Sequence, residues 1–87
     1  MNTERLVAMV NDIAAFFAST AVSDEAVASI ASHLKRYWEP RMRQEIIAHL
    51  AHGGAGLSEA GRRAVQLLAD AATAAGQKAT ASGASSP

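Results

Sequence analysis

The sequence contains no cysteine, only two prolines and few aromatic residues. Without cysteine the chain has neither a disulfide framework nor a thiolate metal site, which fits a reducing, intracellular setting. No run of about 18 apolar residues is present to span a bilayer, and the N-terminus lacks the charged, apolar and small-residue order of a signal peptide. We therefore expect one small cytoplasmic domain with no membrane contact.

The chain also has no excess of charge of one sign, and it has few large apolar side chains. Eight Lys and Arg residues balance eight Asp and Glu residues, so the formal net charge is zero. The hydrophobic fraction is 49%, but 21 of the 87 residues are alanine, which buries little area. A small domain with a thin core usually needs a staple or a partner to be stable. With no disulfide available, we expect a partner protein to provide that support.

Apolar residues recur at helical spacing in four segments, and no strand-like alternation is present. The predicted helices run from a cap at Asn2 or Thr3 to about Ser19, over 24–38 after the cap Ser23, over 40–52, and from a cap at Ser58 to near Ala75 or Gly76. From Gln77 to Pro87 the chain has no large apolar residue, which predicts disorder. The expected fold class is therefore all-α: a small bundle of about four helices in a domain over 1–76, followed by a disordered tail at 77–87.

The first predicted helix is apolar over about half of its circumference. Its apolar residues are Leu6, Val7, Met9, Val10, Ile13, Ala14, Phe16 and Phe17. Such a wide face predicts either a central helix covered on two sides by its own chain or an extra contact with a partner subunit. The apolar sides of the second and fourth helices are predicted as Val27, Ile30, Ala31, Leu34, Tyr37 and Trp38, and as Ala60, Ala64, Val65, Leu67, Leu68, Ala71 and Ala72.

The stretch from His33 to Arg43 holds the one Trp, the one Tyr and half of all basic residues. Pro40 restricts the residue before it and suits a first helical position, so the stretch is predicted to be a corner between two helices. Trp38 continues an apolar stripe, and we expect it to close the core at this corner rather than to stack on a ligand.

Arg43 falls on the apolar side of the third predicted helix. Because an unpaired buried charge is costly, its guanidinium must reach water, an internal carboxylate or an acceptor on a partner. Arginine is the cation best suited to a planar bidentate contact at an interface. Arg41 can pair with Glu45 at i+4, which favours a solvated face for Arg41.

The residues for catalysis are few. The glycine-rich segment 53–56 predicts a helix end and a flexible connection, because the preceding strand and terminal Lys that a P-loop needs are missing. His49 and His52 are spaced i, i+3, but no HExxH pattern and no orienting carboxylate accompanies them, so the metal signal is weak. His33 is expected to be a surface or corner histidine, since the sequence has no Ser or Cys nucleophile elbow for it to activate. We therefore expect no catalytic centre and no cofactor in this chain.

Two function classes remain open from the residues alone. One is an all-helical interaction subunit that docks on a larger protein through the corner 37–43. The other is a small nucleic-acid-binding protein that would use Lys35, Arg36, Arg41 and Arg43 against phosphates. Because nucleic-acid-binding domains are usually basic overall, the zero net charge favours the protein-binding function.

The corner sequence HLKRYWEPRMR, together with the following GGAGLS and the preceding LVAMVNDIAAFF, resembles the delta subunit of bacterial NAD-dependent, molybdenum- or tungsten-containing formate dehydrogenases. The resemblance spans roughly residues 3–68. Two departures stand beside it: Tyr37 occupies a position where the family more often has Phe, and 58–60 reads Ser-Glu-Ala where the family tends to place a proline.

The resemblance implies an accessory subunit of a cytoplasmic complex that oxidises formate to carbon dioxide and reduces NAD. In such complexes an alpha subunit carries the bis-pyranopterin guanine dinucleotide metal centre and iron-sulfur clusters, while beta and gamma subunits carry FMN, NAD binding and further clusters. The delta subunit is expected to bind the alpha subunit and to stabilise it or help assemble it, without nucleic acid. The matching positions that this implies for partner contact are Trp38, Pro40, Arg41, Met42 and Arg43.

Overall fold

The computed structural model describes the backbone of residues 2–84 and the side-chain surroundings of residues 2–73. Its elements are α1 (Thr3–Phe17), α2 (Asp24–Tyr37), α3 (Pro40–Ala51) and α4 (Glu59–Ala84). Over this described part of the chain there is no strand. The predicted all-α fold with four helices is therefore confirmed.

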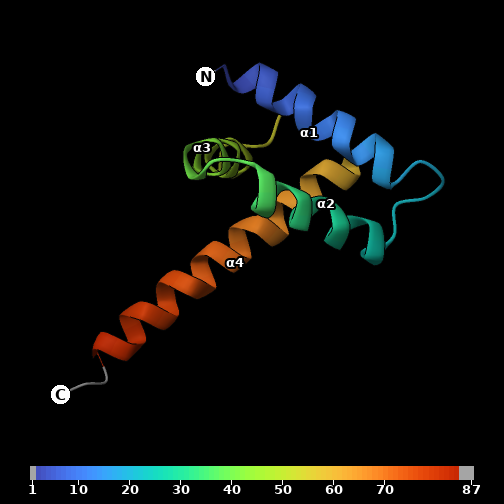
Figure 1. Ribbon diagram of the computed structural model, residues 1–87. Helices are drawn as coiled ribbons and strands as arrows, with labels where there is room; N and C mark the ends of the chain where they lie inside the picture. The colour runs from blue at the N-terminus through green and yellow to red at the C-terminus, as the bar shows by residue number, and fades with distance from the viewer. Residues whose placement is uncertain (1, 85–87) are drawn as a thin grey trace.

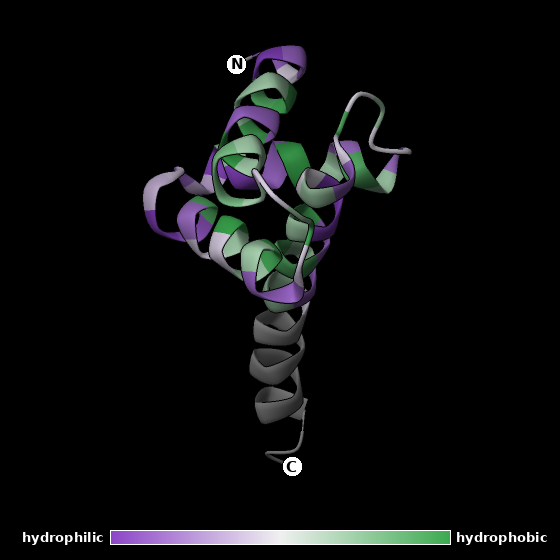
Figure 2. Ribbon diagram, turned by 90° about the vertical axis from the view of Figure 1, so that its right-hand side faces the viewer, coloured by the Kyte–Doolittle hydropathy of each residue, from purple (hydrophilic) through white to green (hydrophobic). Residues whose placement is uncertain are grey.

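The first half of α4 contacts each of the other three helices, and its C-terminal half extends beyond them (Figure 1). Helices α1 and α2 also pack on each other, as do α1 and α3. Hydrophobic and hydrophilic residues alternate around the helices of the bundle (Figure 2). The fold is thus a small bundle built on α4, in which each helix buries one stripe.

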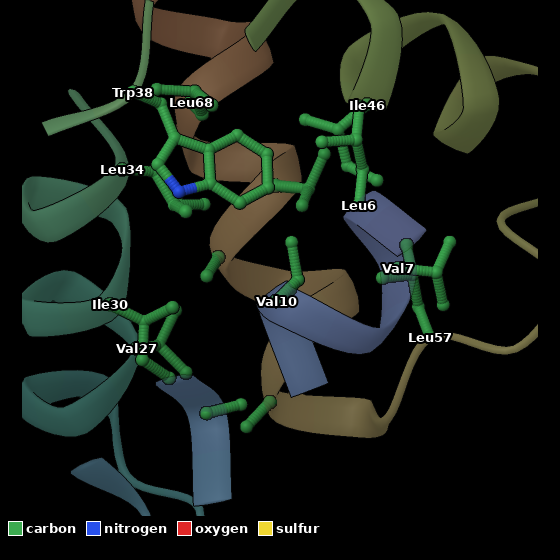
Figure 3. Close-up of a cluster of buried hydrophobic side chains, with 14 residues drawn as sticks. Leu6, Val7, Val10, Val27, Ile30, Leu34, Trp38, Ile46, Leu57 and Leu68 are labelled. Carbon is green, nitrogen blue, oxygen red and sulfur yellow. The ribbon is translucent and has the colours of Figure 1, made fainter. Parts of the chain in front are cut away.

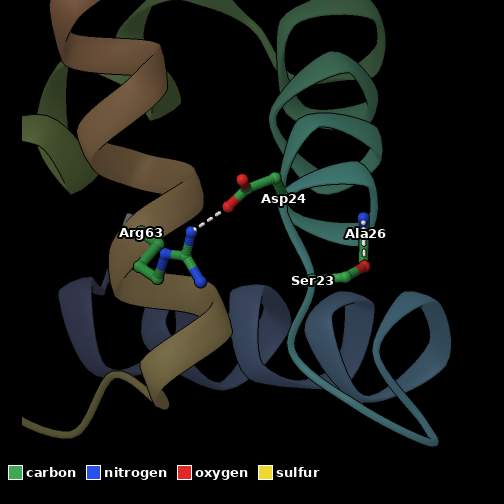
Figure 4. A network of polar contacts seen from close by, with 4 residues as sticks. All are labelled: Ser23, Asp24, Ala26 and Arg63. Carbon is green, nitrogen blue, oxygen red and sulfur yellow. Dashed lines mark hydrogen bonds and ion pairs between the residues drawn. The ribbon is translucent and has the colours of Figure 1, made fainter.

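The helix starts follow the capping chemistry of the sequence. The side chain of Asn2 accepts from the Glu4 N–H at 2.8 Å, and that of Ser23 accepts from the Ala26 N–H at 3.0 Å (Figure 4). Pro40 stands at the start of α3, where its missing N–H costs nothing. At α4 the Ser58 hydroxyl accepts from the Gly61 N–H at 3.2 Å. Each predicted start is therefore confirmed.

The hydrophobic core lies where α1, α2 and α3 meet α4. Its largest fully buried side chains are Leu6, Val10, Ile30, Leu34, Ile46 and Val65. The indole of Trp38, 6% exposed, enters this cluster beside Leu34 and Leu68 (Figure 3). Among the described side chains, no polar or charged one is buried. The predicted core role of Trp38 is confirmed.

The connection between α3 and α4 is a closed turn rather than a loose loop. Gly53 and Gly54 have φ of +114° and +65°, a region that favours glycine. The Gly54 N–H bonds to the His49 carbonyl at 2.9 Å and the Gly53 N–H to the Leu50 carbonyl at 3.0 Å, which is the Schellman pattern. From α4, the guanidinium of Arg62 donates to the carbonyls of Gly53 and Gly54 at 3.0 and 3.2 Å.

A side chain of α1 holds this connection from the other side. The Asn11 amide donates to the Gly56 carbonyl and its oxygen accepts from the Ser58 N–H, both at 2.9 Å. In the first turn of α4, Gly61 lets α1 approach closely, since a Cβ built there would stand 2.9 Å from a methyl group of Val10. These contacts fix the crossing of α1 over the start of α4.

Two expectations about the helices are wrong. The helix expected to end near Ala75 or Gly76 continues to Ala84, because strong helix formers flank Gly76, with Ala75 before it and Gln77 and Lys78 after it, and the cost of the glycine itself is about 1 kcal/mol. Tyr37 and Leu67, expected on apolar faces, are 70% and 43% exposed. Residues 77–84 belong to α4, so the disorder expected over 77–87 is not established, and 85–87 lie outside the described residues.

Candidate interaction surface

Hydrogen bonds from a side chain of α3 to the end of α2 hold the corner between these two helices. One guanidinium nitrogen of Arg43 donates to the Trp38 carbonyl at 2.6 Å and to the Lys35 carbonyl at 3.1 Å. These carbonyls belong to the last turn and the C-cap of α2, which have no partner within the helix. A cation there also lies at the negative end of the helix dipole. Arg43 therefore has an intramolecular role that the sequence did not reveal.

The five predicted contact residues lie at different depths. Trp38 is buried, Met42 and Arg43 are partly buried, and Pro40 and Arg41 are exposed. The structure does not bring them together as one open surface. Their role in partner binding stays a prediction. Of the five, only Pro40 and Arg41 are exposed, so they are the ones most accessible for direct contact at the corner.

The other polar predictions at the corner also change. Arg41 forms no ion pair with Glu45, whose carboxylate instead accepts from the Thr3 hydroxyl at 2.6 Å. Because Arg43 is turned toward backbone carbonyls, the cations available for phosphates are reduced to Lys35, Arg36 and Arg41. This weakens the nucleic-acid alternative further.

An exposed line of aromatic rings begins beside the corner, and we call it the aromatic row: Phe16, Phe17, His33 and Tyr37. Successive ring centroids are 5.2, 5.9 and 4.8 Å apart, so the rings touch from the end of α1 to the end of α2. Phe16 is 77% exposed and Tyr37 is 70% exposed. These rings form a continuous apolar strip in contact with water.

An open hollow of about 500 Å³ lies along the aromatic row, on the outer side of α2. It is lined by Phe17, Glu25, Ala28, Ser29, Ser32, His33, Arg36 and Tyr37. Glu25 and Arg36 mark its two ends, near the start and the end of α2. Among the side chains of residues 2–73 the structure shows one ion pair, between Asp24 and Arg63 (Figure 4), so neither Glu25 nor Arg36 is paired there.

Sequence reasoning found the aromatic row only in part. The wide apolar face of the first helix left open an extra contact with a partner subunit, and Phe16 lies on the exposed part of that face. Neighbouring residues on a helix point about 100° apart, so Phe16 and Phe17 lie on different parts of the wide apolar face, and Phe16 is 77% exposed while Phe17 is 36% exposed. The excess width was the available signal, but which ring would be exposed depends on how α2 packs against α1.

The polar side chains do not gather into a reaction centre within the described residues. Nε2 of His49 lies 2.8 Å from the Ala55 carbonyl oxygen, and Nδ1 of His52 lies 2.8 Å from the Ala48 carbonyl oxygen. Since a carbonyl only accepts, each of these nitrogens carries a proton. In that part of the chain no three His, Asp or Glu side chains lie together as metal ligands. Nor does any helix there combine the length and hydropathy that crossing a bilayer requires.

Comparison with known proteins identifies the family of this chain. No curated protein and no solved structure matches the chain. The family model of the NADH-dependent formate dehydrogenase delta subunit FdsD matches residues 5–65, more than half of the chain. This range contains most of α1, all of α2 and α3, the corner, the glycine turn and the start of α4. The chain therefore belongs to the family of NADH-dependent formate dehydrogenase delta subunits.

Proposed function

We propose that this protein is a non-catalytic accessory subunit of a cytoplasmic NAD-dependent formate dehydrogenase. It binds the catalytic alpha subunit, in a complex that also contains beta and gamma subunits, and it stabilises the alpha subunit or helps to assemble it. The electrons removed from formate pass to NAD within the other subunits. This chain contributes contact surface rather than chemistry.

The observation that carries this proposal is the exposed aromatic row. Large aromatic side chains are enriched at protein interfaces and supply much of their binding energy. Here Phe16 and Tyr37 are more than two-thirds exposed although the domain has few large apolar residues to spare. The chain belongs to a family of subunits, and contact with another subunit would remove these exposed rings from water.

The donor set of the described residues agrees with a role outside the chemistry. The cofactors of the complex, a molybdenum or tungsten pterin centre, iron-sulfur clusters and FMN, need thiolates or dedicated binding loops. This chain has no cysteine, and His49 and His52 are bonded to backbone carbonyls of the α3 end and its turn. We propose that all of these cofactors and NAD are held by the other subunits.

Co-purification tests the proposal. The four subunits are co-expressed with an affinity tag on this chain alone, placed at its C-terminus after Pro87. We expect the alpha subunit to elute with it in constant ratio through a second, size-exclusion step, together with formate-dependent NAD reduction. The pull-down is done at natural expression levels and after overexpression of the subunits. Elution of this chain without the alpha subunit under both conditions would show that the proposed partner is wrong.

A further inference from the structure

We propose that the aromatic row and its hollow bind one amphipathic helix of the alpha subunit, which lies antiparallel to α2 and places an acidic side chain against Arg36. This inference rests on the proposed function, since it names the surface and the kind of segment through which that binding occurs. Its three supports are the apolar strip, the length and floor of the hollow, and the charges at its ends.

The aromatic row supplies the apolar contact. Phe16 and Tyr37, at its two ends, are 77% and 70% exposed, and Phe17 and His33 join them in ring contact. Aromatic anchors of this kind are typical of the few residues that dominate the energy of an interface. A partner segment with large apolar side chains would remove this strip from water.

The dimensions of the hollow fit a helix of about three turns. Glu25 and Arg36 are eleven residues apart on α2, which corresponds to about 16 Å along the axis. Between them the floor consists of Ala28, Ser29 and Ser32, whose short side chains let another backbone approach closely. The aromatic rings stand along one side of this floor, so an entering helix would have small residues beneath it and rings beside it.

The charges at the ends set the direction of the bound helix. Glu25 lies in the first turn of α2 and Arg36 in its last turn, and neither is ion-paired among the described side chains. Helices favour acidic residues in their first turn and basic residues in their last. A helix with this common pattern, laid antiparallel on α2, brings its acid to Arg36 and its base to Glu25. Antiparallel alignment also opposes the two helix dipoles favourably.

A second copy of this chain is the competing occupant, because its own α2 carries the same two charges. It fits less well for a reason of shape. The outer side of α2 would present the short side chains of Ala28, Ser29 and Ser32 to an identical floor, which leaves the hollow of about 500 Å³ poorly filled. A helix with large apolar side chains fills it, and packing without voids is what stabilises an interface.

Variants in the co-expressed complex test this surface. In one set, Phe16→Ala and Tyr37→Ala are combined, and in the other Arg36→Glu reverses the charge at one end of the hollow. Matched controls are Leu67→Ala, an exposed apolar residue of α4, and Arg5→Glu, an exposed cation of α1, neither of which lines the hollow. Circular dichroism melting of each free variant shows that the fold is kept.

We expect the double aromatic variant to weaken capture of the alpha subunit by about tenfold or more. Arg36→Glu should weaken it by a smaller factor that shrinks further as salt is added, since a partly exposed charge pair is screened. Leu67→Ala and Arg5→Glu should capture like the wild type. If the wild type captures the alpha subunit and the double aromatic variant captures it equally well, this inference is overturned while the proposed function stands. If the wild type captures no alpha subunit, both fail.

A photo-crosslinking phenylalanine analogue at position 37, within the assembled complex, identifies the occupant. We expect crosslinks to one segment of the alpha subunit, spaced at helical intervals and containing an acidic residue near its N-terminal end. Crosslinks to another copy of this chain, or to an extended segment without helical spacing, would overturn the proposal.

Discussion

The guanidinium of Arg43, in the first turn of α3, donates a 2.6 Å hydrogen bond to the main-chain carbonyl of Trp38, the residue that ends α2. The indole of the same Trp38 is buried in the core. One residue is thus held through its backbone by the following helix and through its side chain by the whole bundle. These contacts fix the conformation of the corner, and the aromatic row begins on its outer side with Tyr37.

The first prediction concerns Arg43. Arg43→Ala should lower the free energy of unfolding by about 1 to 2 kcal/mol, because carbonyls at the end of α2 lose a charged donor. Urea denaturation of the isolated chain, followed by far-ultraviolet circular dichroism, measures the change. Arg43→Lys should give an intermediate value, since a lysine keeps the charge near the helix end but loses the fixed fork. An unchanged midpoint for Arg43→Ala would show that the two hydrogen bonds contribute nothing in solution.

The second prediction concerns Trp38. Trp38→Ala should destabilise the domain by about 3 to 5 kcal/mol, since it empties a large, 6% exposed site in the core. The isolated chain would then melt far below the wild type or fail to fold. Tyr37→Ala is the matched control. Tyr37 is adjacent to Trp38 in the sequence but 70% exposed, so loss of the Tyr37 ring should change the melting temperature little. Equal effects of the two substitutions would contradict the assignment of one ring to the core and the other to the surface.

The third prediction concerns the crossing of α1 and α4. Gly61→Ala should destabilise the chain by about 1 to 3 kcal/mol through overpacking against Val10, although alanine is the better helix former. In a Val10→Ala background the methyl group in the way is gone, so the same substitution should cost less or become favourable. Denaturation of the four variants of this cycle gives the coupling energy directly. Additive effects would mean that the two helices do not approach as closely as the structure has them.

Local chemistry explains why much of the fold was predictable. Asn2, Ser23 and Ser58 cap helices through backbone groups two or three residues away, and Pro40 acts on its own turn. Such features depend on neighbours in the sequence. Trp38 was predictable as well, because it extends a stripe of apolar residues on one helix.

Long-range contacts explain why the rest was not. The acceptors of Arg43 are carbonyls of the preceding helix, which no residue type in the sequence announces. Tyr37 lies at the edge of an apolar arc, about 60° from Leu34 around α2, so small differences in packing decide whether it is covered. At 76 a glycine suggested a helix end, but the helix-forming residues on both sides of it continue α4. Hydrophobic periodicity and single turn residues were the basis of these predictions, and neither contains the contacts that decide the outcome.

The fourth prediction concerns the end of the chain. Truncation after Gly76 should leave assembly of the complex and formate-dependent activity nearly intact, because residues 77–87 include no large apolar side chain to bury at an interface. Size-exclusion chromatography and activity of the truncated complex are compared with those of the full-length one. Loss of the complex would show that residues 77–87 contribute to partner binding.

The central claim is that this chain supports a catalytic subunit without performing chemistry, and depletion tests it most directly. The alpha, beta and gamma subunits are produced with and without this chain, and formate-dependent NAD reduction is measured per alpha subunit, together with its molybdenum or tungsten content. We predict that the complex lacking this chain has lower activity per alpha subunit, or loses it faster on warming, and that co-expression of the wild-type chain restores it. Equal activity, equal metal content and equal thermal stability in its absence would contradict the account.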